Sequence, residues 1–258
     1  MSNKDFIKYA NKLVDAFLNN KIISPLPKKY TKKLSDAQKL RKICESRITK
    51  PIIGFKAAGT SLTVLKKLKE KEPFYATVYK HNVLQNKKSV KTNKFTMGIE
   101  LEVCYIIKKN FFDLRKKITK KNIKKFILYI APCIEIVGYR QKKRGITSLG
   151  DLCSDFGANV KFIIGQKKIY KNNNVNNLKT KIFNLKIKKI VNGNTNTVYK
   201  NPLNSLFFVL KKIQQDKIKL NKDFYIFTGS SVGVVPILVK GFYKGMVENL
   251  GSVSTKIS

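Results

Sequence analysis

Residues 98–103 read Gly98-Ile99-Glu100-Leu101-Glu102-Val103, and residues 132–137 read Pro132-Cys133-Ile134-Glu135-Ile136-Val137. Both stretches place glutamates among β-branched and apolar residues, in a chain that has 54 Lys+Arg but only 15 Asp+Glu. In a β-strand, residues two apart point to the same face, so Glu100 and Glu102 project together. Two like charges held side by side repel each other, and burial increases the cost. A bound divalent cation would relieve that repulsion, so the pattern predicts a metal site.

The region before these strands predicts helices. Asp5 to Leu18 carries one apolar helical stripe. Ser35-Asp36-Ala37-Gln38 has the spacing of a capping box and predicts the start of a second helix. Pro51 then ends this region. We therefore expect an N-terminal helical segment over residues 1–50 and a catalytic mixed-β domain over residues 51–258.

The rest of the chain predicts a mainly β body with a few helices. The expected strands are Ile52–Lys56, Phe74–Tyr79, Phe95–Ile107, Cys133–Tyr139, Phe224–Phe227 and part of Leu238–Ile257. The expected helices lie near Leu62–Leu68, after Thr119 with the stripe Ile123, Phe126, Ile127 and Ile130, and after the Asn201-Pro202 start signal. We also expect Lys181–Val191 to pair with Thr195–Tyr199 through an Asn192-Gly193 turn. This order predicts the α+β class rather than an alternating parallel fold.

The net charge of +39 raises the alternative of a basic nucleic-acid-binding protein. Only five of the cations are arginines, although arginine is the preferred bidentate reader of phosphate and guanine. The lysines are spread along the chain without the interleaved aromatic residues that bind single strands. We therefore expect no nucleic-acid partner, and a positive field that steers small anionic substrates.

The remaining composition indicates a cytoplasmic protein. Cys44, Cys104, Cys133 and Cys153 form no C-x-x-C pair, which favours reduced cysteines that fill apolar space. The N-terminal residues have no unbroken apolar segment typical of a signal peptide. The longest apolar stretch, Phe126 to Tyr139, is too short for a membrane span and contains Glu135.

Six short motifs occur in an order that is typical of one family. They are Ile53-Gly54-Phe55-Lys56, Gly98-Ile99-Glu100-Leu101-Glu102, Ile134-Glu135-Ile136-Val137-Gly138-Tyr139-Arg140, Asn201-Pro202-Leu203, Phe227-Thr228-Gly229 and Leu250-Gly251-Ser252-Val253. From about Ser35 to Ser258, the chain resembles the 2-keto-4-pentenoate hydratase and 2-oxo-hex-3-enedioate decarboxylase branch of the fumarylacetoacetate hydrolase superfamily. The resemblance implies a mixed β roll with an N-terminal helical segment, usually assembled as a homo-oligomer.

The resemblance also assigns roles to residues. It implies that Glu100, Glu102 and Glu135 bind one Mg²⁺ or Mn²⁺, which suits hard oxygen ligands. It implies that Lys56 is the proton-transfer residue beside the metal, with a pKa that burial and the cation lower toward neutrality. The small 2-oxo acid substrate would contact Thr228 and Gly229, with Thr60, Ser61 and Asp155 as weaker candidates.

The chain departs from the family pattern where hydratases handle water. Phe74 follows Pro73 at a position where an acidic residue is expected, and Lys80-His81 replaces an acidic pair. His81 could act as an acid or base instead, although a surface histidine is the simpler interpretation. The leading hypothesis is therefore a metal-dependent lyase that adds water to a short 2-hydroxydienoate or 2-oxo-enoate. A decarboxylase of the same family is the alternative, and a tautomerase-like or degenerate enzyme also stays open.

Overall fold

The computed structural model describes residues 3–141, 146–187 and 189–258. The helices are α1 (Asn3–Leu18), α2 (Leu34–Glu45), α3 (Leu62–Lys67), α4 (Leu149–Ser154) and α5 (Pro202–Gln215). The strands are β1 (Ile52–Ala58), β2 (Phe74–Tyr79), β3 (Val83–Gln85), β4 (Ser89–Val90), β5 (Thr96–Ile107), β6 (Ile127–Gly138), β7 (Asn159–Ile164), β8 (Lys168–Ile169), β9 (Lys179–Asn184), β10 (Ile190–Asn194), β11 (Phe224–Ser230), β12 (Val235–Pro236), β13 (Gly241–Val247) and β14 (Gly251–Ile257). Within the described residues, no helix is both long enough and apolar enough to cross a membrane.

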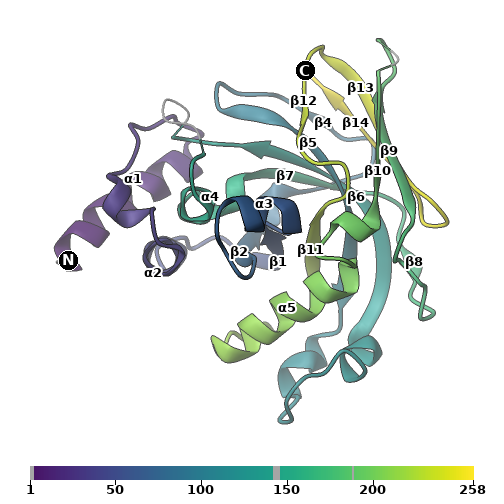
Figure 1. Ribbon diagram of the computed structural model, residues 1–258, viewed down its shortest axis with the longest axis horizontal. Helices are drawn as coiled ribbons and strands as arrows, with labels where there is room; N and C mark the ends of the chain where they lie inside the picture. Colours follow the sequence, from purple (N-terminus) through teal and green to yellow (C-terminus); the bar gives the residue numbers. More distant parts are fainter. Residues whose placement is uncertain (1–2, 142–145, 188) are drawn as a thin grey trace.

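Two sheets and a set of peripheral helices make up the molecule (Figure 1). The larger sheet has the order β2-β1-β11-β5-β6-β7-β3, with β12 also paired to β5 and β8 to β6. The smaller sheet has the order β10-β9-β13-β14-β4. In Figure 1, α1 and α2 lie at one end of the molecule and the smaller sheet lies at the other. Parallel and antiparallel pairs occur in both sheets, which confirms the predicted α+β class with a mixed β roll.

The two faces of the larger sheet have different contents, because side chains alternate along each strand. From β5, the apolar face contributes Ile99, Leu101 and Val103 to the main hydrophobic core. Helix α5 packs against β11 and β1 and adds five buried residues to the same core, Leu206, Phe208, Val209, Leu210 and Ile213. The opposite face carries the glutamates and a smaller apolar cluster of Val78, Cys104, Ala131, Cys133, Phe162, Ile164 and Phe227. The predicted role of these two cysteines as buried apolar fillers is thus confirmed.

The N-terminal helices pack on one edge of the β body. Phe6, Leu13 and Phe17 of α1 form a buried cluster that also contains Tyr79 and Phe156 from the β body. The predicted capping box is wrong, because α2 begins at Leu34 and its N-cap residue makes no side-chain hydrogen bond. A capping box occurs instead at α4, where Ser148 and Asp151 satisfy each other's backbone N–H groups.

The prediction of an α-helix after Thr119 is wrong as well. A short 3₁₀ helix spans Asn122–Phe126, and β6 begins at Ile127, six residues before the expected start of this strand. A continuous apolar run fits helical and strand periodicity alike, so its own pattern does not decide between them. Pairing with β5 from Ile107 to Thr96 decides it, because this pairing satisfies the backbone along the whole of β6.

The expected pairing of Lys181–Val191 with Thr195–Tyr199 is wrong, because a hairpin forms here from other residues. β9 pairs with β10 in antiparallel register, so the chain reverses between Asn184 and Ile190. Asn192 and Gly193 lie inside β10, and Thr195–Thr197 is a 3₁₀ turn rather than a strand. A Cβ atom at Gly193 would lie 2.0 Å from the Ser231 carbonyl oxygen. This glycine therefore serves the close approach of two backbones rather than a tight turn.

Candidate metal centre and active site

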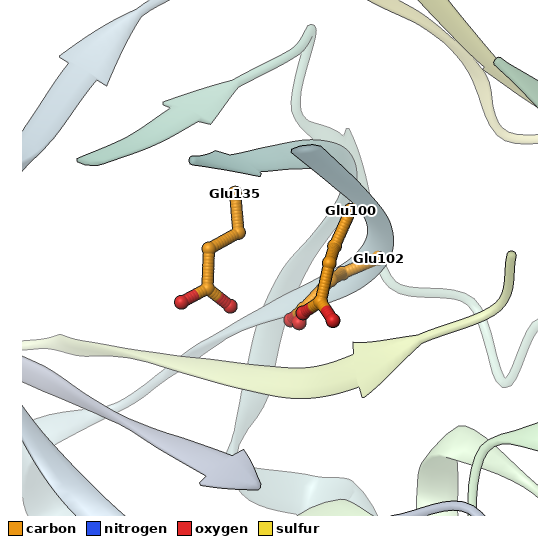
Figure 2. Close-up of side chains that lie close together, drawn as sticks. All are labelled: Glu100, Glu102 and Glu135. Carbon is orange, nitrogen blue, oxygen red and sulfur yellow. The ribbon is translucent and has the colours of Figure 1, made fainter. Parts of the chain in front are cut away.

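Three carboxylates converge from two neighbouring strands. In the antiparallel pairing of β5 with β6, Glu100 lies directly opposite Glu135, and Glu102 lies two residues further along the same face. Figure 2 shows the three side chains extending to the same side of these strands, with their carboxylates side by side. One oxygen from each carboxylate can be chosen so that all three lie within 4.8 Å of one another. The structure therefore brings together the three predicted metal ligands.

Two of these carboxylates are each held by a protein donor through one oxygen only. Gly229 N donates to Glu102 Oε2 at 3.1 Å, and Lys56 Nζ donates to Glu135 Oε1 at 2.5 Å. The second oxygens, Glu102 Oε1 and Glu135 Oε2, are fully buried without a hydrogen-bond donor. A buried acceptor without a partner is costly. Two such oxygens beside the half-buried Glu100 form a donor set that fits a hard divalent cation such as Mg²⁺ or Mn²⁺.

The charge balance supports the same interpretation. Burial raises the pKa of Glu100 to about 7, and the Glu135 carboxylate adds to this while Lys56 opposes it. Burial likewise raises the pKa of Glu102 to about 7 against the opposing effect of Lys56, and the pKa of Glu135 is raised well above its usual range. Three carboxylates and one ammonium carry a net charge of −2 when ionised, which a divalent cation would neutralise.

Lys56 is the basic side chain of this site. It comes from β1, is 2% exposed, and its Nζ also donates to the Gly157 carbonyl oxygen at 2.9 Å. Desolvation lowers the pKa of Lys56, but Glu135, Glu100 and Glu102 together raise it above the usual value. The expected lowering of this pKa toward neutrality includes the effect of a bound cation, so it stays a prediction. Because its Nζ contacts both Glu135 and the Gly157 carbonyl oxygen, Lys56 is held where a proton-transfer group beside the carboxylates would be needed.

A cavity of about 510 Å³ opens onto this centre. Lys56, Glu100, Thr60, Ser61 and Gly229 are among its lining residues, so four side chains and one backbone position from the predicted site lie together. Its apolar lining includes Val64, Met97, Val137, Ile146, Leu152, Val232 and Val234. Lys56 and Glu100 are the ionisable side chains among the described lining residues. The cavity thus combines one charged centre with a mainly apolar wall.

The end of β11, which contains Thr228 and Gly229, contacts the carboxylate cluster and β5. Gly229 has a φ of 101°, and a Cβ atom there would lie 2.1 Å from Thr60 Oγ1. This backbone conformation, which favours glycine, turns the Gly229 N–H towards Glu102. Thr228 is buried and donates its hydroxyl to the Val103 carbonyl oxygen at 2.8 Å. Thr228 therefore does not line the cavity, whereas Gly229 does.

Three other residues singled out in the sequence lie away from the cavity. Asp155 is fully buried and forms an ion pair with Arg140 at 2.8 Å. Phe74 is buried in an apolar cluster with Ala58 and Leu65. His81 is exposed, and its ring lies beside those of Phe17 and Tyr79. Neither Phe74 nor His81 is among the residues that line the cavity, so the structure gives His81 no place there as an acid or base.

Metal binding should weaken as the pH falls. Glu100 and Glu102 have pKa values of about 7, raised from 4.5, so below pH 7 protons compete with the cation for both. We expect the affinity for Mg²⁺ or Mn²⁺ to fall at least about tenfold between pH 8 and pH 6. Without a cation, the same raised pKa values make the folded state less stable as the pH rises from 4.5 to about 7. Calorimetric titration and thermal melts across this range measure both effects, and a pH-independent affinity would contradict the assignment.

The sequence comparisons find no relative. No protein-family profile matches the sequence. No curated protein matches it either.

Solved structures, in contrast, match over most or all of the chain. The chain is similar to 4-oxalocrotonate decarboxylase from Pseudomonas putida G7, complexed with magnesium and adipate, with a TM-score of 0.87 and 18% identity over 100% of this chain and 99% of that one. It is also similar to a fumarylacetoacetate hydrolase family protein from Yersinia pestis CO92, with a TM-score of 0.60 and 13% identity over 82% and 95% of the two chains. A third match is 5-carboxymethyl-2-hydroxymuconate delta-isomerase from Mycobacterium smegmatis, with a TM-score of 0.58 and 11% identity over 80% of each chain. The chain therefore has the fold of the fumarylacetoacetate hydrolase superfamily, as its sequence motifs imply.

Proposed function

We propose that this protein is a divalent-metal-dependent lyase that decarboxylates a short 2-oxo-enedioate. The observation that carries the proposal is the convergence of Glu100, Glu102, Glu135 and Lys56, two of which, Lys56 and Glu100, line one cavity. The full-length structural similarity to 4-oxalocrotonate decarboxylase, which was crystallised with magnesium and adipate, supports this substrate class. Membership of the fumarylacetoacetate hydrolase superfamily is part of the same proposal.

The carboxylates would hold the cation, and Lys56 would supply the proton. When bound, a divalent cation supplies Lewis-acid stabilisation of the negative charge that develops on the 2-oxo oxygen. For 2-oxo-hex-3-enedioate, the C5–C6 bond breaks, C6 leaves as CO₂, and the electron pair moves through the conjugated chain to the oxygen on C2. The Lys56 ammonium donates one proton to that oxygen, which gives 2-hydroxypenta-2,4-dienoate. Lys56 then regains its proton from water.

The cavity wall favours this reaction over hydration. Hydration requires a group that activates a water molecule, and the described lining offers no ionisable side chain besides Lys56 and Glu100. Phe74 lies in an apolar cluster and His81 lies outside the cavity, so neither supplies that group. An apolar wall also suits the conversion of a charged carboxylate into neutral CO₂. Hydration of 2-hydroxypenta-2,4-dienoate, our leading hypothesis from the sequence, is therefore the second candidate.

Substrate turnover tests the proposal directly. The purified protein with Mg²⁺ is incubated separately with 2-oxo-hex-3-enedioate and with 2-hydroxypenta-2,4-dienoate, while CO₂ release and the dienol absorbance are followed. We expect one CO₂ per enedioate consumed, loss of activity with EDTA, and recovery on adding Mg²⁺. Loss of the dienol absorbance without CO₂ would assign hydration instead. If neither compound is consumed and EDTA leaves ligand binding unchanged, the metal-dependent lyase function is wrong.

The assembly state stays a prediction that follows from the resemblance. We propose a homo-oligomer, and sedimentation velocity on the purified protein measures it. A single species at the mass of the 29.5 kDa chain would contradict it.

A further inference from the structure

Three consecutive residues beside the metal centre adopt a left-handed backbone. Phe156, Gly157 and Ala158 have φ angles of 54°, 71° and 61°. Glycine tolerates this region, whereas a residue with a Cβ atom is strained in it. Such a turn persists only when its surroundings hold it in place, and strained backbone of this kind clusters at functional sites. The question is therefore what holds this turn and what it positions.

Arg140 holds the turn at both ends. Asp155 precedes the turn, and its Oδ2 and Oδ1 accept hydrogen bonds from Arg140 N at 2.6 Å and from Arg140 Nη1 at 2.8 Å. Asn159 follows the turn, and its carbonyl oxygen accepts a hydrogen bond from Arg140 Nη2 at 3.3 Å. The guanidinium lies 5.0 Å from the Phe17 ring centre and 4.8 Å from that of Phe95. The Arg140–Asp155 ion pair is fully buried. This pair, which we call the clamp of the turn, therefore has little freedom to move.

The turn presents one backbone oxygen to Lys56. The Gly157 carbonyl oxygen accepts a hydrogen bond from Lys56 Nζ at 2.9 Å, in addition to the contact of Nζ with Glu135 Oε1 at 2.5 Å. A Cβ atom at Gly157 would lie 3.3 Å from Lys56 Cδ, so a larger residue would press on the lysine chain. Lys56 is thus fixed between a predicted metal ligand on one side and the left-handed turn on the other.

We propose that Arg140 and Asp155 are positioning residues that hold the left-handed turn so that Gly157 orients the Lys56 ammonium group. This inference rests on the proposed function, in which Lys56 donates the proton. It replaces the expected role of Asp155 in substrate binding, because both of its carboxylate oxygens are bonded to Arg140 and it does not line the cavity. Phe17 of α1 contacts the guanidinium and lies 4.6 Å from the Phe156 ring, so the N-terminal helical segment completes the clamp.

The substitution Asp155→Asn tests the clamp. It keeps the shape of the side chain but turns one acceptor into a donor that faces an Arg140 N–H group. Displacement of a catalytic group by about 1 Å can cost about 100-fold in rate, so we expect kcat to fall by about 10- to 100-fold. KM and the Mg²⁺ affinity should change less than about twofold, since the cation ligands and the cavity wall are untouched. In the Lys56→Ala background, Asp155→Asn should cause no further loss, because it acts through Lys56.

Two controls separate positioning from a general loss of stability. Glu45→Gln weakens another arginine–carboxylate pair, the partly buried Arg41–Glu45 at 2.5 Å. We expect it to lower the melting temperature while kcat stays unchanged. Gly157→Ala should reduce kcat as Asp155→Asn does, whereas Gly251→Ala, which also has a positive φ but no atom within 4 Å of an added Cβ, should not.

Several outcomes would overturn the inference. A wild-type kcat in the Asp155→Asn variant would do so. A double variant with Lys56→Ala would also do so if its fold-loss in kcat were the product of the two single losses. If Asp155→Asn does not fold, Gly157→Ala with its Gly251→Ala control decides. If the wild-type protein consumes neither compound, the proposed function fails, and crystal structures then test the inference alone. In that case, a Lys56 Nζ to Gly157 O distance that stays near 2.9 Å in Asp155→Asn would overturn it.

Discussion

Lys56→Ala is expected to lower turnover by about 10²- to 10⁴-fold, to a residual rate that can still be measured, while the protein still binds Mg²⁺. Lys56 is the buried cation that faces the cavity, and positioned proton transfer of this kind is worth about 10²- to 10⁴-fold in rate. The cation ligands remain in place, so calorimetry should still detect binding of one metal ion. Steady-state assays of CO₂ release measure the loss.

The same substitution should also lower the stability of the metal-free protein. Removing the ammonium leaves the buried Glu135 carboxylate without its ion pair, and breaking such a pair costs about 3–5 kcal/mol. We therefore expect the metal-free variant to unfold at lower denaturant concentration, and Mg²⁺ to recover more stability in the variant than in the wild type. Lys161→Ala is the matched control, because Lys161 is a partly buried lysine on β7 that bonds the His81 carbonyl oxygen instead. A Lys56→Ala enzyme as active as the wild type would remove Lys56 from the mechanism.

Glu102→Gln is expected to cost most of the metal affinity and, with it, the activity. Glu102 has one oxygen fixed by Gly229 N and one buried oxygen without a donor, which we assign to the cation. Loss of residues that merely support a metal ligand costs about 10- to 100-fold in affinity, so loss of a ligand should cost at least that much. Titration with Mn²⁺, followed by its electron paramagnetic resonance signal, measures this without any substrate.

The stability of the metal-free protein should change in the opposite direction. At pH 8 the wild-type Glu102 is ionised although its pKa is raised from 4.5 to about 7, so the folded state carries an unfavourable charge. A neutral glutamine removes that charge, and we expect the metal-free variant to be more stable by about 1–3 kcal/mol at pH 8. The control is Glu72→Gln, which alters a partly exposed ion pair with Lys212. It should change neither the metal affinity nor the stability of the metal-free protein. A variant that binds Mn²⁺ as tightly as the wild type would refute the ligand assignment.

The cluster of three carboxylates was predictable because its pattern is local. Side chains alternate along a strand whatever the rest of the chain does, so Glu100 and Glu102 share a face once the segment is extended. The rarity of acids made Glu135 equally conspicuous. The start of α5 was predictable for the same reason. The Asn201 side chain accepts a hydrogen bond from Leu203 N, only two residues along the chain, and so caps the helix.

Other elements were not predictable, because distant partners decide them. The apolar residues around Ile127 fit a helix, and their pairing with β5 made them a strand instead. Asn192-Gly193 resembles a turn, yet the carbonyl oxygen of Ser231 occupies the space that a side chain would need there. Asp155 has no local signal at all for its ion pair, since Arg140 lies 15 residues away.

The sequence by itself determined the three carboxylates and the direction in which they point, since both follow from the geometry of an extended chain. Only the tertiary structure decided which lysine meets them and what holds that lysine. Lys56 is separated from Glu135 by 79 residues and from Gly157 by 101. Contacts over such separations form only when strands from different parts of the chain pair, and no local periodicity encodes that pairing.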